Sequence, residues 1–307
     1  MKKILVLSIL ALSVFTLSAC GGSDAFDGDI NVYTRDTTSG TRDGFMSGIG
    51  YSEATTDDSK LVEGFVTQNN AGIMNAMATD VYGIGYVSMA SVNDTIKALN
   101  FEGVEATLDN VLDDSYGLKR PFNYMLRADD DFASDEIKQI SYAFIAYLQT
   151  NDASDVINDI GAIALVTNQN WADISDEHPI CSADNSDLTL RFGGSDSITA
   201  VAQALSADFA PRCGNVVPEH DHTGSGDAFR RTQGDQKDGV NAKEIGFASR
   251  DFRGEELDET SEETRGQLAW DAIVAIVHLN NPVDSLTAEE IKAIYAGEIT
   301  SWSEFID

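Results

Sequence analysis

The stretch Thr34-Arg35-Asp36-Thr37-Thr38-Ser39-Gly40-Thr41-Arg42-Asp43 lies between a short apolar run at residues 30–32 and a helix-like run at residues 45–49. This position predicts a turn that joins a strand to a helix. Such a turn directs several backbone N–H groups and the positive end of the helix dipole at one point. Its hydroxyls and the planar Arg35 guanidinium add further donors. The stretch therefore suits an oxyanion, although the same residue types also serve as an ordinary helix N-cap.

Two further stretches repeat this arrangement. Residues 188–192 alternate as a strand, Gly193-Gly194-Ser195-Asp196-Ser197 follows, and residues 198–209 continue at helical spacing. The stretch Thr223-Gly224-Ser225-Gly226-Asp227 again follows an apolar pair and precedes a helix-like run. None of the three turns contains the lysine of a P-loop. Three hydroxyl-bearing turns of this kind favour an anion-binding protein over three unrelated helix caps.

The first residues have the pattern of a bacterial lipoprotein signal. Two lysines precede an apolar run that is short for a membrane span and that ends at Leu17-Ser18-Ala19-Cys20. We expect residues 1–19 to be a signal peptide, Cys20 to be lipidated, and residues 20–28 to form a flexible tether. The mature protein is then exported and lipid-anchored to the cell membrane, facing the periplasm or the cell exterior. The alternative is a core cysteine in a failed transmembrane helix.

Cys181 and Cys213 are the remaining cysteines. Because an exported protein lies where disulfides persist, the simplest prediction is that these two thiols form a disulfide. On the chain-entropy model, closing that loop would stabilise the fold by about 3–4 kcal/mol.

The chain is strongly acidic, with a formal net charge of −31 at pH 7. Recognition of a nucleic-acid backbone needs a basic surface, so nucleic acid is excluded as a partner. A small anion is not excluded, because the Debye length at physiological salt is roughly 8 Å and distant carboxylates are screened. Donors that touch the ligand therefore decide whether it binds.

Length and periodicity predict an α/β protein with two lobes. β-like and helical runs alternate along 307 residues, which is more than one core usually holds. Residues 118–126 are expected to be an extended crossover, because Pro121 discourages both a helix and a central strand. Residues 137–148 carry apolar residues at helical spacing, and the polar segment 168–187 is the best candidate for an internal linker.

Together these motifs resemble those of the PstS-type phosphate-binding proteins of ABC importers, a periplasmic-binding-protein family. The resemblance covers nearly all of the chain after residue 28. Members typically show a GSTS-type turn, SGSGDxF, an IGxASR strand, an apolar strand ending in NPxN, LTxExIxxIYxGxIxxW, RDxxSGTRxxF and IGYxS. Similar stretches here occupy, in that order, residues 194–197, 223–229, 245–250, 273–281, 286–302, 35–45 and 84–88.

The motifs stand in a different chain order from the one typical of that family. Those expected first occupy residues 188–307, and those expected later begin at residue 29. The resemblance therefore implies a two-lobed type II periplasmic-binding-protein fold in circularly permuted order, with a ligand cleft between the lobes. One lobe would comprise residues 29–116 plus 279–307, and the other residues 117–278. Permutation is tolerated where chain ends lie close together at the surface.

The resemblance also implies a phosphate site to which both lobes contribute, with either Thr223 or Ser225 taking part. Asp196 stands where such turns usually have a Thr, and Arg250 stands where some members have an Asp that accepts a proton from phosphate. Asp196 is thus a candidate for distinguishing phosphate from sulfate, and its alternatives are to cap the next helix or to pair with Arg250. The candidate contacts are Arg35, Ser39, Gly40, Thr41, Ser195, Asp196, Ser197, Thr223, Ser225 and Arg250.

The function implied by the resemblance is binding of inorganic phosphate and its delivery to the membrane permease of an ABC importer. The expected protein is a monomer and not an enzyme, and it needs neither a cofactor nor a metal. Sulfate or molybdate is the alternative ligand.

A different class of function is suggested by Glu219-His220-Asp221-His222. Two histidines at alternate positions of a strand project to one face and suit zinc, as in a metal-dependent phosphoesterase. A third strong ligand is not evident in the sequence, so solvated loop histidines are the simpler interpretation.

Overall fold

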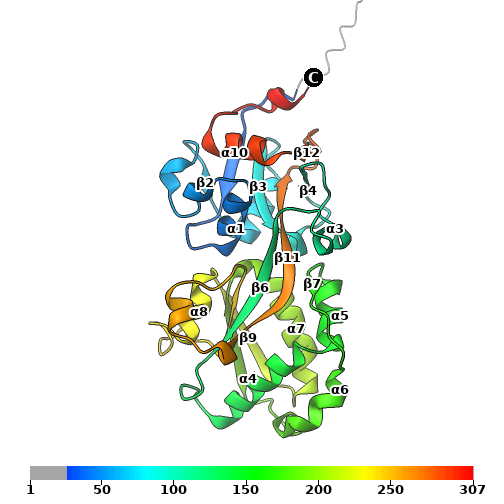
Figure 1. Ribbon diagram of the computed structural model, residues 1–307, viewed down its shortest axis with the longest axis vertical. Coiled ribbons are helices and arrows are strands. Elements are labelled where there is room, and N and C mark those ends of the chain that lie inside the picture. Colours follow the sequence, from blue (N-terminus) through cyan, green and yellow to red (C-terminus); the bar gives the residue numbers. More distant parts are fainter. Residues whose placement is uncertain (1–25, 307) are drawn as a thin grey trace, which may run out of the picture.

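The computed structural model describes residues 26–306 (Figure 1). The predicted signal peptide at residues 1–19 and the lipidation site Cys20 lie outside the described residues. Within residues 26–306, no helix is both long and apolar enough to cross a membrane. The end of the expected tether is packed rather than free, because the Phe26 ring lies 4.9 Å from that of Tyr82.

A curled sheet runs the length of the described chain and joins ten strands. Eight of them lie side by side in the order β2 (Val66–Thr67), β1 (Asn31–Thr34), β3 (Gly83–Ser88), β11 (Arg265–Val277), β6 (Lys119–Leu126), β10 (Ile245–Ala248), β8 (Thr189–Gly194) and β9 (Val217–His222). The other two, β4 (Lys97–Ala98) and β7 (Ile163–Ala164), pair with β11, while β5 (Asn100–Phe101) and β12 (Ser285–Leu286) form a separate parallel pair.

The helices pack on this sheet in two groups (Figure 1). One group lies around β1 and β3 and contains α1 (Gly40–Gly48), α2 (Asn70–Met77), α3 (Leu108–Leu112) and α10 (Ala288–Ala296). The other lies around β8 to β10 and contains α4 (Asp135–Tyr147), α5 (Asn151–Asp159), α6 (Trp171–Ile174), α7 (Thr199–Arg212), α8 (Gly226–Thr232) and α9 (Glu255–Asp258). The mixed α/β architecture is the predicted one.

Two large apolar clusters form the core. The first lies within residues 32–118 and 272–302, apart from Ile163, and the second lies within residues 122–269. The change from one cluster to the other therefore falls inside β6 and inside β11. The expected lobe boundaries, which place residues 117–278 in one lobe, stay a prediction. In β11 the second cluster ends at Ala269 and the first resumes at Ala272, a few residues before the expected boundary at residue 278.

β6 and β11 connect the two clusters. Along β11, the antiparallel pairing with β6 runs from Arg265↔Met125 to Ala272↔Lys119. After that point β11 continues alongside β3. At this crossing the Asp271 carboxylate accepts hydrogen bonds from Arg120 Nε and Nη2, at 2.9 and 2.8 Å, and from the Ser88 hydroxyl at 2.8 Å. All three side chains are buried. A buried ion pair therefore connects the two strands in addition to their backbone hydrogen bonds.

Residues 119–126 are extended, as predicted, but the expectation that Pro121 discourages a central strand is wrong. β6 lies between β11 and β10 in the sheet. Its pairing with β10 covers only residues 123–126, so Pro121 faces a strand on one side alone, where its register partner is Trp270. Because proline lacks only its own backbone donor, a position that is an edge locally tolerates it.

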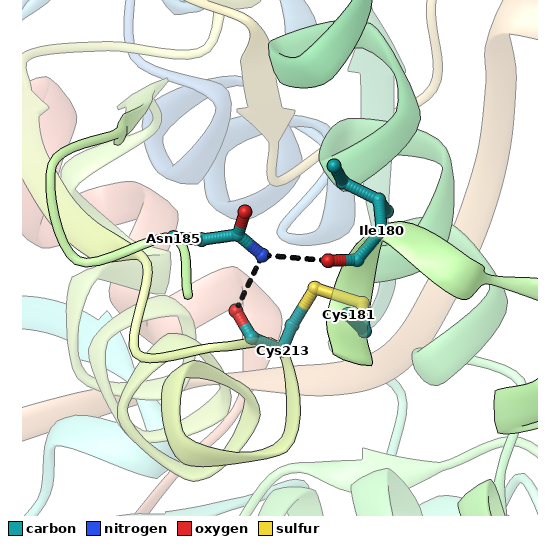
Figure 2. Close-up of a disulfide and its surroundings, with 4 residues drawn as sticks. All are labelled: Ile180, Cys181, Asn185 and Cys213. Atoms are coloured by element: carbon teal, nitrogen blue, oxygen red, sulfur yellow. Dashed lines mark hydrogen bonds between the residues drawn. A yellow bond between two sulfur atoms is a disulfide. The ribbon is translucent and has the colours of Figure 1, made fainter. Parts of the chain in front are cut away.

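The segment 168–187 is not a bare linker. It carries α6, and Trp171 is buried in the second cluster. Cys181 and Cys213 form the predicted disulfide, and Asn185 Nδ2 donates to the carbonyl oxygens of Ile180 and Cys213, at 2.9 and 3.2 Å (Figure 2). The disulfide and these hydrogen bonds therefore hold the segment against the end of α7, in the second cluster.

The two ends of the described chain meet. Ile30 N donates to the Thr300 carbonyl oxygen at 2.8 Å, and Trp302 N donates to the Gly28 carbonyl oxygen at 3.1 Å. The closeness of the chain ends that a circular permutation requires is thus observed for residues 28–30 and 300–302, and Asp307 lies outside the described residues.

Candidate functional site

The Arg35 stretch forms the predicted strand-to-helix turn. β1 ends at Thr34, and α1 begins at Gly40 with Ser39 as its N-cap. The Ser39 hydroxyl accepts hydrogen bonds from the backbone N–H groups of Thr41 and Arg42, at 3.2 and 3.4 Å. The buried Arg42 Nη1 donates to the Arg35 carbonyl oxygen at 3.0 Å, which fixes the backbone where the Arg35 side chain departs.

Arg35 reaches the turn that follows β8. Its Nη1 lies 3.3 Å from both the Thr41 and the Ser197 hydroxyl oxygens, and these two oxygens are 2.5 Å apart. Its Nη2 forms an ion pair with the Asp196 carboxylate. Arg35, Thr41 and Ser197 are buried. Two of the three predicted turns therefore meet through a guanidinium, two hydroxyls and a carboxylate.

The Asp196 carboxylate has a second donor. Its other oxygen accepts a hydrogen bond from the backbone N–H of Asn70 at 3.0 Å, at the first residue of α2. The alternative in which Asp196 pairs with Arg250 is wrong. A planar cation and an N–H at a helix start are the groups that hold the oxygens of an oxyanion, and here they hold a carboxylate.

The third predicted turn joins the same point through hydroxyls. Ser249 Oγ lies 2.9 Å from Ser195 Oγ and 3.2 Å from Ser225 Oγ, and the Ser249 backbone N–H donates to Ser225 Oγ at 3.1 Å. A Cβ added at Gly40 would lie 2.3 Å from Ser225 Oγ. We call the residues that meet here the anion cluster: Arg35, Ser39, Gly40, Thr41, Ser195, Asp196, Ser197, Ser225 and Ser249.

Gly194 determines the course of the turn at residues 195–197. Its φ is +92°, and a Cβ there would lie 2.2 Å from the Phe247 carbonyl oxygen. The Ser195 backbone N–H donates to that same oxygen at 2.7 Å. Only glycine fits this close approach in this conformation, so Gly194 places the turn against β10.

Two candidate residues are engaged elsewhere. The Thr223 hydroxyl donates to the Asp227 carboxylate, and Arg250 pairs with Glu256 through Nη1 and Nη2 at 2.7 and 2.8 Å. Neither joins the anion cluster in this structure. Arg250 instead lines a cavity of about 820 Å³ that also contacts Thr38 and Gly226, beside the cluster.

The prediction omits two residues that the structure brings in. Ser249 stands next to Arg250 in the strand motif, so its position in the sequence does carry a signal. Asn70 carries no such signal in the sequence. It contacts Asp196 from 126 positions away, through a backbone N–H that any residue except proline would supply. A pocket of about 330 Å³, lined by Asn70, Asp196, Thr199 and His222 among others, opens the cluster to the surface.

The two histidines of Glu219-His220-Asp221-His222 lie side by side in β9 as predicted, with their ring centroids 5.3 Å apart. Within residues 26–306, no group of three or more His, Cys, Asp or Glu side chains is arranged to hold a metal ion. His220 Nδ1 and His222 Nε2 lie 3.1 Å apart and contact each other.

Comparison with known proteins confirms the resemblance. Residues 181–307 match the model of the PBP superfamily domain. The chain is 26% identical over 311 residues to the phosphate-binding protein PstS 2 of Streptococcus pneumoniae serotype 4, covering 99% of this chain and 98% of that protein. It is 27% identical over 318 residues to PstS 2 of Streptococcus agalactiae serotype V, covering 99% of both.

A solved structure has the same fold. The phosphate-binding protein of a phosphate ABC transporter from Streptococcus pneumoniae TIGR4 superposes with a TM-score of 0.62 at 23% identity, over 90% of this chain and 99% of that one. The sequence alignments run from end to end of both proteins. The order of segments that differs from the typical family pattern is therefore shared with these relatives and is not peculiar to this chain.

Proposed function

We propose that this protein binds inorganic phosphate at the anion cluster, between the two lobes, and delivers it to the membrane permease of an ABC importer. In this proposal it is an exported lipoprotein anchored through Cys20, it acts as a monomer, and it binds its ligand without converting it. Closure of two lobes over an anion excludes water and surrounds the ligand with fixed donors, which gives affinity without turnover.

One observation carries the proposal. The Arg35 guanidinium and the Asn70 backbone N–H converge on one carboxylate, and the buried hydroxyls of Thr41 and Ser197 lie within 3.3 Å of Arg35. These donors come from three elements that are far apart in the chain. A site that holds the oxygens of a carboxylate in this way has the chemistry to hold the oxygens of a tetrahedral anion.

The names of the relatives support phosphate over sulfate or molybdate, since they are called phosphate-binding proteins. Among the hydroxyl candidates we favour Ser225 over Thr223, because Ser225 already lies in the anion cluster while Thr223 is bound to Asp227. Arg250 would contact the ligand only after leaving Glu256. The phosphoesterase alternative has less support, because His220 and His222 are hydrogen-bonded to each other.

Calorimetric titration of the mature protein with phosphate, sulfate and molybdate tests the proposal. We expect phosphate to bind, and Arg35→Ala to remove most of that binding because no other guanidinium in the cluster replaces the lost donors. Arg253→Ala is the matched control, since Arg253 is an exposed arginine that pairs with Asp43. A wild-type protein that shows neither heat nor a thermal shift with millimolar phosphate would exclude this function.

A further inference from the structure

The paired histidines of β9 lie directly behind the anion cluster. The His220 ring stacks on Phe192 with centroids 4.9 Å apart, and the His222 ring stacks on Phe247 with centroids 6.2 Å apart. Both imidazoles are partly buried, between the sheet and α7. Nothing in the proposed contact set uses them, yet their polar atoms are fully engaged.

Their hydrogen bonds form one continuous chain. Ser206 Oγ of α7 lies 2.9 Å from His220 Nε2, His220 Nδ1 lies 3.1 Å from His222 Nε2, and His222 Nδ1 lies 3.1 Å from the Ser195 carbonyl oxygen. A carbonyl oxygen can only accept, so His222 carries its proton on Nδ1. Its Nε2 then accepts from His220 Nδ1–H, which leaves His220 Nε2 as an acceptor for the Ser206 hydroxyl. The single hydrogen of Ser206 also has the Gln203 carbonyl oxygen within 3.1 Å, so the directions fixed by the Ser195 carbonyl are those of the two bonds that His222 makes.

The chain ends on the backbone of the anion cluster. The Ser195 backbone N–H is held by the Phe247 carbonyl oxygen at 2.7 Å, and its hydroxyl lies 2.9 Å from Ser249 Oγ. The bond from His222 Nδ1 therefore fixes the third polar group of Ser195. Ser195 immediately precedes Asp196 and Ser197, so its orientation determines where those two side chains point.

We propose that His220 and His222 are positioning residues, which in their neutral form hold the turn at residues 195–197 in the geometry that binds the anion. This inference rests on the proposed anion-binding function. The last bond of the chain, from His222 Nδ1–H to the Ser195 carbonyl oxygen, is the one that reaches the turn. Removing that donor should therefore weaken anion binding for a reason that lies behind the site rather than in it.

The surroundings keep both rings neutral at pH 7. Burial, reinforced by His220, lowers the pKa of His222 to about 4, against opposing contributions from the Ser195 carbonyl, Asp196 and Asp221. Burial, together with the charge of Lys243, lowers the pKa of His220 to about 4. The uncharged groups packed against the pair are Phe192, Phe247 and Ser206.

The test compares two substitutions of His222. His222→Phe keeps a ring that can stack but removes the donor to Ser195, and we expect phosphate affinity at pH 7.5 to fall by about tenfold. His222→Asn keeps an N–H near the place of Nδ1 and cannot titrate, so we expect it to bind phosphate within about threefold of wild type. His278→Asn is the matched control, because His278 accepts from Asn280 N and lies outside the chain of hydrogen bonds.

The comparison of the two variants separates positioning from mere packing. If His222 positions Ser195 through its Nδ1–H, His222→Asn binds phosphate more tightly than His222→Phe, whereas a packing role favours the aromatic variant. Imidazole ¹⁵N spectra of the ligand-free protein should show both rings protonated on Nδ1. Equal affinity of His222→Phe and wild type, or an Nε2–H tautomer of His222, would overturn the inference. A wild-type protein that binds no phosphate would instead overturn the proposed function, and the positioning role with it.

Discussion

The Asp196 carboxylate occupies two of the donors that an incoming anion would use. One oxygen pairs with Arg35 and the other accepts from Asn70 N. Asp196 therefore has two effects on a ligand: it competes for the donors, and it presents an acceptor to any proton that the ligand carries. Competition for the donors weakens the binding of every anion alike. Only the second effect depends on the chemistry of the ligand.

Phosphate near neutral pH carries at least one proton, and sulfate carries none. A carboxylate in a desolvated site accepts a hydrogen bond from phosphate but faces only lone pairs on sulfate, which is unfavourable. Asp196→Asn keeps the size of the side chain and removes its charge. We expect sulfate binding to improve relative to phosphate by more than about tenfold, or about 1.4 kcal/mol. Competitive titrations of the two anions measure this ratio.

Asp43→Asn supplies the control for that ratio, because Asp43 pairs with the exposed Arg253 and lies outside the anion cluster. If Asp196→Asn strengthened both anions equally, Asp196 would be a competitor for Arg35 without a part in selectivity. If it changed neither, the carboxylate would serve only to neutralise Arg35.

At the scale of elements, the anion cluster depends on how closely the start of α1 approaches β10 and α8. Gly40 makes this approach possible, since a Cβ there would lie 2.3 Å from Ser225 Oγ and 2.9 Å from Ser249 Oγ. The Ser225 hydroxyl would have to rotate and give up its contact with Ser249, or α1 would have to move outward. Either response opens the contact between elements from different core clusters.

Gly40→Ala should therefore lower phosphate affinity by about tenfold while the protein stays folded, because the added methyl acts at the contact and not in either core. Gly226→Ala is a closely matched control: Gly226 begins α8 beside the same cluster, and a Cβ there meets no atom within 4 Å. Calorimetry gives the affinities, and thermal unfolding shows whether both variants keep their fold. Equal affinity for the two variants would mean that α1 need not lie this close.

The sequence predicts the three turns because each depends on neighbours in the chain. Ser39 caps the helix that begins next to it, so the pattern of strand, hydroxyl residue and helix reveals it. Gly194 stands in the same pattern, although the Phe247 carbonyl oxygen that excludes a Cβ there belongs to another strand. The ion-pair partners of these side chains cannot be predicted in this way. Asp196 pairs with Arg35 from 161 positions away and Arg250 pairs with Glu256 within six, and no local pattern decides between these pairings.

Pro121 illustrates the same limit at the level of the sheet. The rule that proline avoids central strands is sound, but it applies to the pairing at one residue and not to the strand as a whole. β10 stops opposite residue 123, which no feature of residues 118–126 reveals. The order of strands and the exact extent of each pairing come from the folded molecule.

At the scale of the whole molecule, both ends of the described part of the chain pack against the ring of Trp302. The Trp302 ring is 6.3 Å from that of Phe26 and 5.9 Å from that of Phe305. The first apolar cluster, apart from Ile163, already combines residues 32–118 with residues 272–302, so joining those two parts covalently leaves its packing unchanged. The second cluster lies within residues 122–269. The fold should therefore tolerate a different starting point.

A re-ordered chain tests this directly. A variant that begins at Asp187, runs to Ile306, passes through a short Gly/Ser linker to Phe26 and ends at Ser186 would restore the order typical of the wider family. The new ends fall between two exposed residues, and Cys181 can still reach Cys213. We expect this variant to fold and to bind phosphate within about threefold of the wild type, because the anion cluster keeps every contact. The control carries the same linker but opens between Met125 and Leu126, in β6, where both residues pair with β11 or β10, and it should fail to fold. If opening at Ser186 were as damaging as opening inside β6, the order of segments would itself be needed for folding, and the near contact of the chain ends would not be enough to make them interchangeable.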